Sequence, residues 1–300
     1  MKSFLSIVLA ITPGLLYACN VCGGSANSQN LGVLPQFNKH FIGIQYSSKF
    51  FQSYEDIDHI SGNSSSDHYQ NLQIWGRYTI SKRIQLYAFL PYSYNKSNHD
   101  GLPVIINGIG DLSMIANYRL IRADDCNPLW KHSLQLGGGI KLPTGNYIPV
   151  GGREGLPNML PGTGSWDVIA NLNYSLQYGK TGLSIDGNYT MNTANNESYK
   201  FGNRLNVSIL GYHTLVGKGY TLLPFAGIRI ECYAKNFENY RKHWVDDMTG
   251  GKVVFATLGL QTFYKRIGFN VSASLPIVQV YSDNLISAGL KVETGIQLLF

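Results

Sequence analysis

Residues 286–300 read ISAGLKVETGIQLLF, and apolar and polar side chains alternate along this stretch. Successive side chains of a β-strand point to opposite faces. One face then carries Ile286, Ala288, Leu290, Val292, Thr294, Ile296, Leu298 and Phe300. The other face carries Ser287, Gly289, Lys291, Glu293, Gly295 and Gln297. Such a strand suits a wall that meets lipid on one side and water on the other, so the segment predicts a transmembrane β-strand.

The same alternation recurs upstream in segments of about ten residues, the length of a transmembrane strand in a barrel. It predicts strands near 40–51, 69–80, 83–95, 109–121, 132–142, 166–178, 182–194, 201–213, 220–234, 252–264, 267–278 and 286–300. The fold class that follows is all-β, a transmembrane antiparallel up-and-down barrel of about twelve strands.

The predicted connections alternate between short and long. Short ones fall at 81–82, 179–181, 216–219 and 265–266, with one of intermediate length at 122–131. Longer ones fall at 52–68, 96–108, 143–165, 235–251 and 279–285, and the link at 195–200 departs from the pattern. Bacterial barrels have short periplasmic turns and longer outer loops. Both the N- and the C-terminus are therefore predicted to be periplasmic.

The first 18 residues are typical of a secretory signal peptide. Lys2 precedes the apolar run Phe4–Ile11, and the small residue Ala18 ends the segment. The run is too short to span a bilayer as a helix. We therefore expect a signal peptide over 1–18, a periplasmic segment over 19–38 and a barrel over 39–300, located in the outer membrane of a Gram-negative bacterium.

Composition and the C-terminus narrow the class of protein. The net charge is +6, but Lys and Arg are scattered rather than clustered, so no nucleic-acid partner is expected. A soluble all-β domain is the alternative fold. The signal peptide counts against it, as does the terminal Phe300, which resembles the C-terminal signal of barrels inserted by the barrel assembly machinery. The expected partners are the outer-membrane bilayer, that machinery and an unidentified small solute.

Charged residues on the predicted strands should face the lumen, because Lys or Arg on the lipid side costs about 2–4 kcal/mol at the bilayer midplane. The lumen-facing candidates are Arg77, Asp111, Arg119, Lys141, Asp167, Asp186, Arg204, Arg229, Glu231, Lys291 and Glu293. Two interpretations stay open for them. They form either a paired network that plugs the barrel or the lining of a conducting path.

Three motifs in the middle of the chain resemble a known family. They are GIGDLSMIANYRL at 108–120, GGGIKLPTG at 137–145 and GTGSWD at 162–167. Their order and spacing resemble the outer-membrane transporter family of the meta-pathway phenol-degradation type. The N-terminal CNVCGG and LGVLPQF are similar to a Bacteroidetes subgroup of that family. The resemblance implies a barrel and transport across the outer membrane, while the motif residues themselves fit either turn formation or contact with a permeant.

The pair Cys19 and Cys22 forms a CxxC motif just after the predicted cleavage point. Two thiolates at this spacing can close a disulfide or share a soft metal ion, and Cys19 is also a candidate for lipidation. His40, His59 and His68 do not have metal-ligand spacing, and Cys126 and Cys232 are isolated thiols, the second on a predicted lipid-facing position. No other cofactor is expected.

The sequence favours a channel or transporter for a small solute, with a lumen narrower than that of a sixteen-stranded porin. The alternative is a closed barrel that binds a ligand or handles metal or redox chemistry through the CxxC motif. An outer-membrane hydrolase is the third reading, with His213 as candidate base, but no Ser/His segment or nucleophile elbow stands out and no enzyme is expected. The sequence leaves open whether the loop at 143–165 folds into the lumen.

Overall fold

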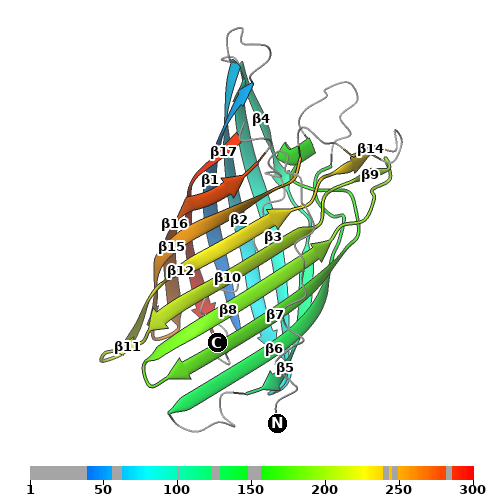
Figure 1. Cartoon of the computed structure of the whole chain (residues 1–300). Coiled ribbons are helices and arrows are strands. Elements are labelled where there is room, and N and C mark those ends of the chain that lie inside the picture. Colours follow the sequence, from blue (N-terminus) through cyan, green and yellow to red (C-terminus); the bar gives the residue numbers. More distant parts are fainter. Residues whose placement is uncertain are drawn as a thin grey trace, which may run out of the picture.

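The computed structural model describes residues 39–55, 63–99, 102–122, 129–147, 157–238, 243–244, 249–281 and 286–300. Over these residues the chain forms a closed antiparallel barrel of 12 strands (Figure 1). The barrel strands are β1 (Phe41–Glu55), β2 (Asn63–Thr79), β3 (Ile84–His99), β4 (Leu102–Ile109) with β5 (Ser113–Ile121), β6 (Trp130–Lys141), β7 (Asp167–Tyr178), β8 (Thr181–Met191), β10 (Arg204–His213), β12 (Tyr220–Tyr233), β15 (Gly251–Tyr264), β16 (Ile267–Val280) and β17 (Ile286–Leu299). The predicted fold class is confirmed.

The first and last strands close the barrel. Phe41 of β1 lies opposite Leu299 of β17 on one side and Arg77 of β2 on the other. The backbone N–H of Phe300 donates to the carbonyl of His40 at 3.0 Å, and the His40 ring stacks between Tyr78 and Phe300. The C-terminus therefore lies at the end of the barrel that carries the short turns (Figure 1).

Shorter elements lie at the two ends of the barrel. β11 (Leu215–Val216) pairs with β12 beside a short turn. At the opposite end, β9 (Tyr199–Lys200), β13 (Phe237–Glu238) and β14 (His243–Trp244) form a small separate sheet, and η3 (Pro157–Met159) is a 3-10 turn. The described residues include no helix long and apolar enough to cross a membrane.

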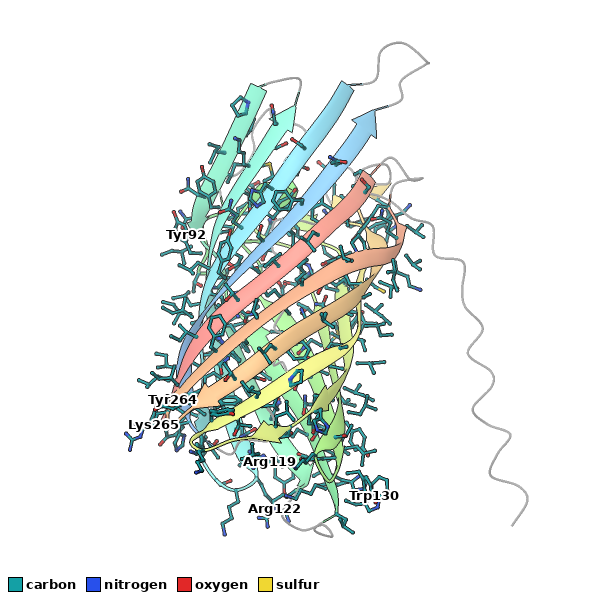
Figure 2. All side chains as sticks on the ribbon, turned by 90° about the vertical axis from the view of Figure 1, so that its left-hand side faces the viewer. Tyr92, Arg119, Arg122, Trp130, Tyr264 and Lys265 are labelled. Carbon is teal, nitrogen blue, oxygen red and sulfur yellow. The ribbon has the colours of Figure 1, made fainter. Side chains whose placement is uncertain are left out.

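The strands β1 to β4 extend beyond their neighbours at the loop end (Figures 1 and 2). β1 continues to Glu55 and β2 begins at Asn63, so much of the predicted loop 52–68 is strand. The segment 63–66 reads NSSS and has no apolar alternation. Polar side chains on both faces give no hydrophobic period, which is why the sequence pattern predicted a loop there.

The outward face of the barrel is an apolar band with aromatic residues toward its short-turn end. Leu258, Leu275 and Ile277 are among its most exposed side chains, and Tyr264 and Trp130 lie near the short turns (Figure 2). Exposing these apolar side chains to water would cost free energy, whereas contact with lipid does not. A closed wall with an apolar exterior and aromatic rim confirms the predicted outer-membrane location.

One part of the predicted face assignment is wrong. Ala288 was placed on the lipid face, but it is buried, and Ile286 is only partly exposed and packs beside it. The cause is a β-bulge: Lys49 lies opposite Lys291, whereas Phe51 lies opposite Ala288, so three residues of β17 face two of β1. An extra residue in one strand reverses its alternation.

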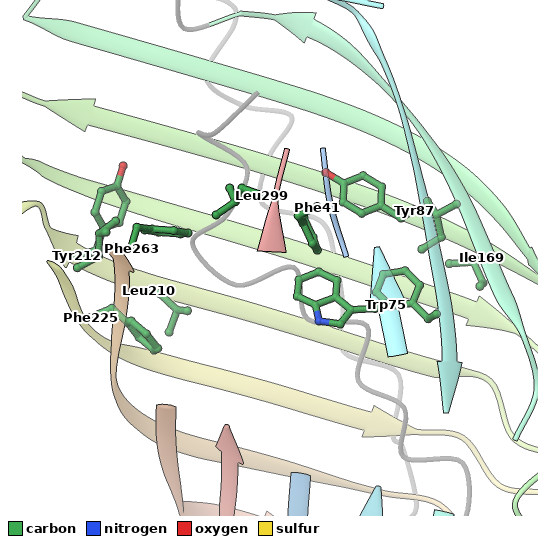
Figure 3. Packing of buried hydrophobic residues seen from close by; sticks show 12 residues of the cluster. Phe41, Trp75, Tyr87, Ile169, Leu210, Tyr212, Phe225, Phe263 and Leu299 are labelled. Carbon is green, nitrogen blue, oxygen red and sulfur yellow. The ribbon is translucent and has the colours of Figure 1, made fainter. Parts of the chain in front are cut away.

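Two clusters of buried apolar residues occupy the interior. The larger draws on most of the barrel strands and brings Trp75 against Phe41 and Phe89 (Figure 3). The smaller lies nearer the loop end and contains Phe51, Tyr69, Met159, Val253, Phe255, Tyr281 and Ala288. Residues 1–38 lie outside the described residues, so the predicted signal peptide and periplasmic segment stay predictions.

The lipid-facing assignment can be tested with matched arginine substitutions. Leu258→Arg, near the middle of β15, should lower the free energy of unfolding in lipid vesicles by about 2–4 kcal/mol. Val216→Arg, at the short-turn rim, should lower it by about 1 kcal/mol or less, because the cost falls toward the interface. Urea titration monitored by heat-modifiable gel mobility measures both. Equal effects would contradict the depth assigned to Leu258.

Candidate functional site: the lumen

The lumen is lined by charged and amide side chains. All the charged residues predicted to face it are buried, namely Arg77, Asp111, Arg119, Lys141, Asp167, Asp186, Arg204, Arg229, Glu231, Lys291 and Glu293. Lys49 of β1 joins them and was missing from the predicted set. Lys49 shares one face of β1 with Gln45 and Ser47, and this row of polar side chains was the sequence signal for a lumen-facing position. Burial shows where these side chains lie. Their role in the passage of a solute stays a prediction.

Five of these residues form what we call the ion network: Lys49, Arg229, Glu231, Lys291 and Glu293. The Lys291 ammonium lies 2.9 Å from Glu231 Oε1 and 3.1 Å from Glu293 Oε1. The Lys49 ammonium lies 3.0 Å from Glu231 Oε2, and Arg229 pairs with Glu293. β12 is separated from β1 by β15, β16 and β17, so the Lys49–Glu231 pair spans the lumen interior. The network holds three cations and two anions.

A second group, the loop latch, consists of Asp111, Lys141, Thr163, Ser165 and Asp167. Lys141 pairs with Asp167, and its ammonium lies 3.4 Å from Asp111 Oδ2 and 2.7 Å from Thr163 Oγ1. Thr163 donates its backbone N–H and its hydroxyl to Asp111 Oδ2, both at 2.8 Å. The Ser165 hydroxyl donates to Asp167 Oδ1 at 2.9 Å. Each of the three sequence motifs contributes to the latch.

The local backbone explains why the latch residues sit there. β4 and β5 both pair with β3, and Ile109 lies opposite Tyr92 while Ser113 lies opposite Phe89. Three residues separate Ile109 from Ser113, whereas two separate Phe89 from Tyr92, so the chain bulges at 110–112 and turns Asp111 inward. Pro91, which has no N–H for the ladder, accepts from Gly110 N at 2.8 Å there.

Two glycines of the motifs are required for close approach of the loop. A Cβ on Gly145 would lie 2.7 Å from the carbonyl carbon of Gly110, and one on Gly162 would lie 2.8 Å from the carbonyl carbon of Gly145. Gly145 N–H also donates to Asp111 Oδ1 at 3.0 Å. The three backbone segments are therefore packed directly against one another, with no space for side chains between them.

The described part of the loop before β7 folds into the barrel. Met159 and Leu160 are buried, and Met159 belongs to the smaller interior cluster with Tyr69 and Phe255. The Met159 carbonyl accepts from the Asn95 amide at 2.7 Å. Residues 157–166, which we call the inward loop, therefore narrow the lumen, which answers the question that the sequence left open.

An amide ladder follows the inner wall of β5 to β8. Asn117 donates to Asn171 at 2.7 Å, Asn171 donates to Asn188 at 2.8 Å, and Asn188 donates to Asp186 at 2.8 Å. Asn173 also donates to Asp186, at 3.3 Å. Neutral donors thus surround the Asp186 carboxyl, which forms none of the salt bridges found among the described residues.

The remaining arginines are anchored to other parts of the wall. Arg77 donates from Nε and Nη2 to the Lys39 carbonyl at 3.0 and 2.7 Å and lies over the Phe41 ring. Arg119 donates to the Lys82 carbonyl at 3.3 Å. The Arg204 guanidinium lies 6.0 Å from the Tyr233 ring centroid.

The described residues contain no metal site or disulfide at the cysteines and histidines singled out in the sequence. Cys19, Cys22, His59 and Cys126 lie outside those residues. Cys232 is half-buried and forms no disulfide there. No group of three His, Cys, Asp or Glu side chains in that part of the chain could hold a metal ion. His213 is exposed beside a short turn, where its Nδ1 lies 2.9 Å from Thr181 Oγ1.

Comparison with known proteins shows that the barrel is similar in fold to outer-membrane barrels of known structure. An outer membrane channel from Pseudomonas putida F1 has a TM-score of 0.63 at 14% identity, covering 87% of this chain and 96% of its own. The transport unit of the autotransporter AIDA-I from Escherichia coli has a TM-score of 0.50 at 8% identity, covering 92% and 95%. No family model and no curated protein matches the chain. The chain therefore has the fold of an outer-membrane β-barrel.

Removing the Asp111 carboxyl should release the inward loop. Asp111→Ala deletes the acceptor of Gly145 and Thr163, and breaking a buried pair costs about 3–5 kcal/mol. In vesicles we expect chymotrypsin to cleave after Met159, which is buried in the wild type, faster in this variant, as measured by mass spectrometry. Asp186→Ala removes a buried carboxyl outside the latch and should leave cleavage unchanged. Equal protection in Asp111→Ala and the wild type would contradict the latch.

Proposed function

We propose that the protein is an outer-membrane channel for a small polar solute, with the inward loop as the element that limits passage. The observation that carries the proposal is the loop latch, which holds this loop inside the lumen through the hydrogen bonds of Thr163 with Asp111 and Lys141. Polar bonds of this kind can be exchanged for bonds to water or to a solute. A loop fixed by apolar packing alone would offer no such exchange.

The lining of the lumen supports the same function. A barrel that served only as an anchor could fill its interior with apolar side chains, which avoid the desolvation of buried charges. Beside its two apolar clusters, this barrel also buries the ion network and the amide ladder along its inner wall. Both supply donors and acceptors to a polar solute that crosses the interior, and neither resembles an enzyme site. The proposed role is therefore passage, without chemistry in the lumen.

The transporter family, the assembly route and the cysteine pair extend the proposal. The transporter family suggested by the three motifs fits the channel fold, and its cargo is left open. Insertion by the barrel assembly machinery would use Phe300 and the strand β17 that pairs with β1. A metal or redox role for Cys19 and Cys22 concerns residues outside the described ones, and it is the second candidate function.

Planar-bilayer recording of the refolded protein tests the proposal. The wild type should show small channels, and Asp111→Ala should increase conductance or the fraction of time open, because the loop is no longer held. Glu197→Ala, which removes an exposed carboxyl at the loop end outside the latch, serves as the control. A folded protein that stays silent in both the wild type and Asp111→Ala would overturn the channel assignment and favour the closed, binding barrel.

Selectivity should depend on the ion network. Glu231→Gln and Glu293→Gln each remove one negative charge and leave Lys49, Arg229 and Lys291 in place. We expect the reversal potential in a KCl gradient to shift toward that of chloride, since uncompensated lumen cations attract anions. Glu197→Gln, at the loop end outside the network, should leave the potential unchanged. An unchanged potential in both network variants would place the conducting path elsewhere.

A further inference from the structure

Three polar side chains are joined by hydrogen bonds on the outward side of β1 and β2. Ser48 Oγ lies 2.8 Å from His68 Nε2, and His68 Nδ1 lies 3.1 Å from the Gln70 side-chain nitrogen. The imidazole therefore lies between the Ser48 hydroxyl at one ring nitrogen and the Gln70 amide at the other. A nucleophile, a base and a group that orients the base are the parts of a serine hydrolase site.

The strand register brings these residues together. Ser48 lies opposite Gln70, and Phe50 lies opposite His68. The exposed neighbours Phe50 and Leu72 share their alternation, whereas Lys49 and Tyr69 point inward. The Phe50 ring stacks on the imidazole at 4.0 Å and 12°, which fixes the orientation of the ring.

The three residues lie at the upper edge of the apolar band. Toward the short turns, the outward residues of these strands are Ile42, Ile44, Leu72 and Ile74. Toward the loops they are Gln52 and Ser66, followed by Lys96 and Asn98 on the neighbouring strand β3, all exposed. This change from apolar to polar marks the boundary between hydrocarbon and headgroups. The ester carbonyls of membrane lipids lie at that boundary.

We propose that Ser48, His68 and Gln70 form an outward-facing site that hydrolyses the acyl ester of a membrane glycerophospholipid. Ser48 keeps 8% of its surface exposed on this side, which restricts approach to a group that lies against the barrel wall. Lys96 lies opposite His68 in the register with β3, so it places a cation beside the site for the lipid phosphate. This activity is independent of the lumen and of the proposed channel.

The chemistry starts from the imidazole that carries its hydrogen on Nδ1, which the Gln70 amide oxygen holds once the amide has turned. His68 Nε2 takes the hydroxyl proton as Ser48 Oγ bonds to the ester carbonyl carbon. The carbon–alkoxy bond then breaks, the leaving alcohol oxygen takes the proton from the imidazolium, and an acyl ester remains on Ser48. Water, deprotonated by Nε2, attacks the acyl carbon; the bond to Oγ breaks and Oγ regains the proton. The net reaction consumes one ester and one water and releases a fatty acid and a lysolipid.

Gln70 decides which nitrogen of the ring acts as the base. Its amide carries an oxygen and a nitrogen on one planar group, and half a turn exchanges them. With the oxygen toward His68, Nδ1 donates and Nε2 is free to accept the serine proton. With the nitrogen toward the ring, as in this structure, Nε2 carries the hydrogen. Gln70 is thus a positioning residue, and a carboxylate in its place would hold the reactive tautomer.

The test uses the full chain refolded in detergent and in phosphatidylcholine vesicles. A fluorescent fluorophosphonate should label Ser48, as identified by peptide mass spectrometry, and the vesicles should release fatty acid. Ser48→Ala should abolish both signals, and His68→Asn should lower the rate of release at least about 100-fold, the usual contribution of a general base. Gln70→Leu should also lower the rate, whereas Gln70→Glu should keep or raise it.

Ser47→Ala is the matched control, because Ser47 is the adjacent residue of the same strand on the opposite face. It should retain labelling and release, and heat-modifiable gel mobility confirms folding of each variant. The proposal is overturned if the folded wild type is not labelled at Ser48, or if it releases no more fatty acid than Ser48→Ala. Should Ser48→Ala fail to fold, the comparison of wild type with folded His68→Asn decides.

Discussion

The whole structure depends on the requirement that no backbone hydrogen-bonding group be left unpaired in lipid. A sheet meets this requirement only by closing on itself, and β1 does so by pairing with both β2 and β17. Closure then fixes two faces for every strand. Each side chain points either to lipid or to the lumen, so a single residue step separates an apolar environment from a polar one.

The lumen follows from that division. Charged residues excluded from the lipid face gather inside, where low dielectric makes an unpaired charge costly. The ion network and the loop latch meet this cost by pairing residues that are far apart in the chain, such as Lys49 with Glu231. These paired charges also hold the inward loop in the barrel, because Asp111 and Lys141 both bond to Thr163. Charge compensation and obstruction of the lumen therefore have one cause.

The same division allows two independent functions in one wall. Ser48 and Lys49 are neighbours in β1, yet the first bonds to His68 on the outward side and the second to Glu231 inside. A solute in the lumen and a lipid against the exterior never meet the same side chains. Changes on one face can thus be made with little consequence for the other, provided that the register of β1 and β2 is kept.

The sequence by itself determined the fold class, the strand number and the placement of most lumen charges, because alternation and loop length are local properties. It failed at Ala288, where a bulge reverses the alternation, and in 63–66, where polar residues on both faces hide the strand. Only the tertiary structure decided which residues meet: the three motifs in the latch, and Ser48 with His68 across two strands. Such contacts depend on strand register and on barrel closure. Both are set by all the strand pairs together, so one segment of sequence does not reveal them.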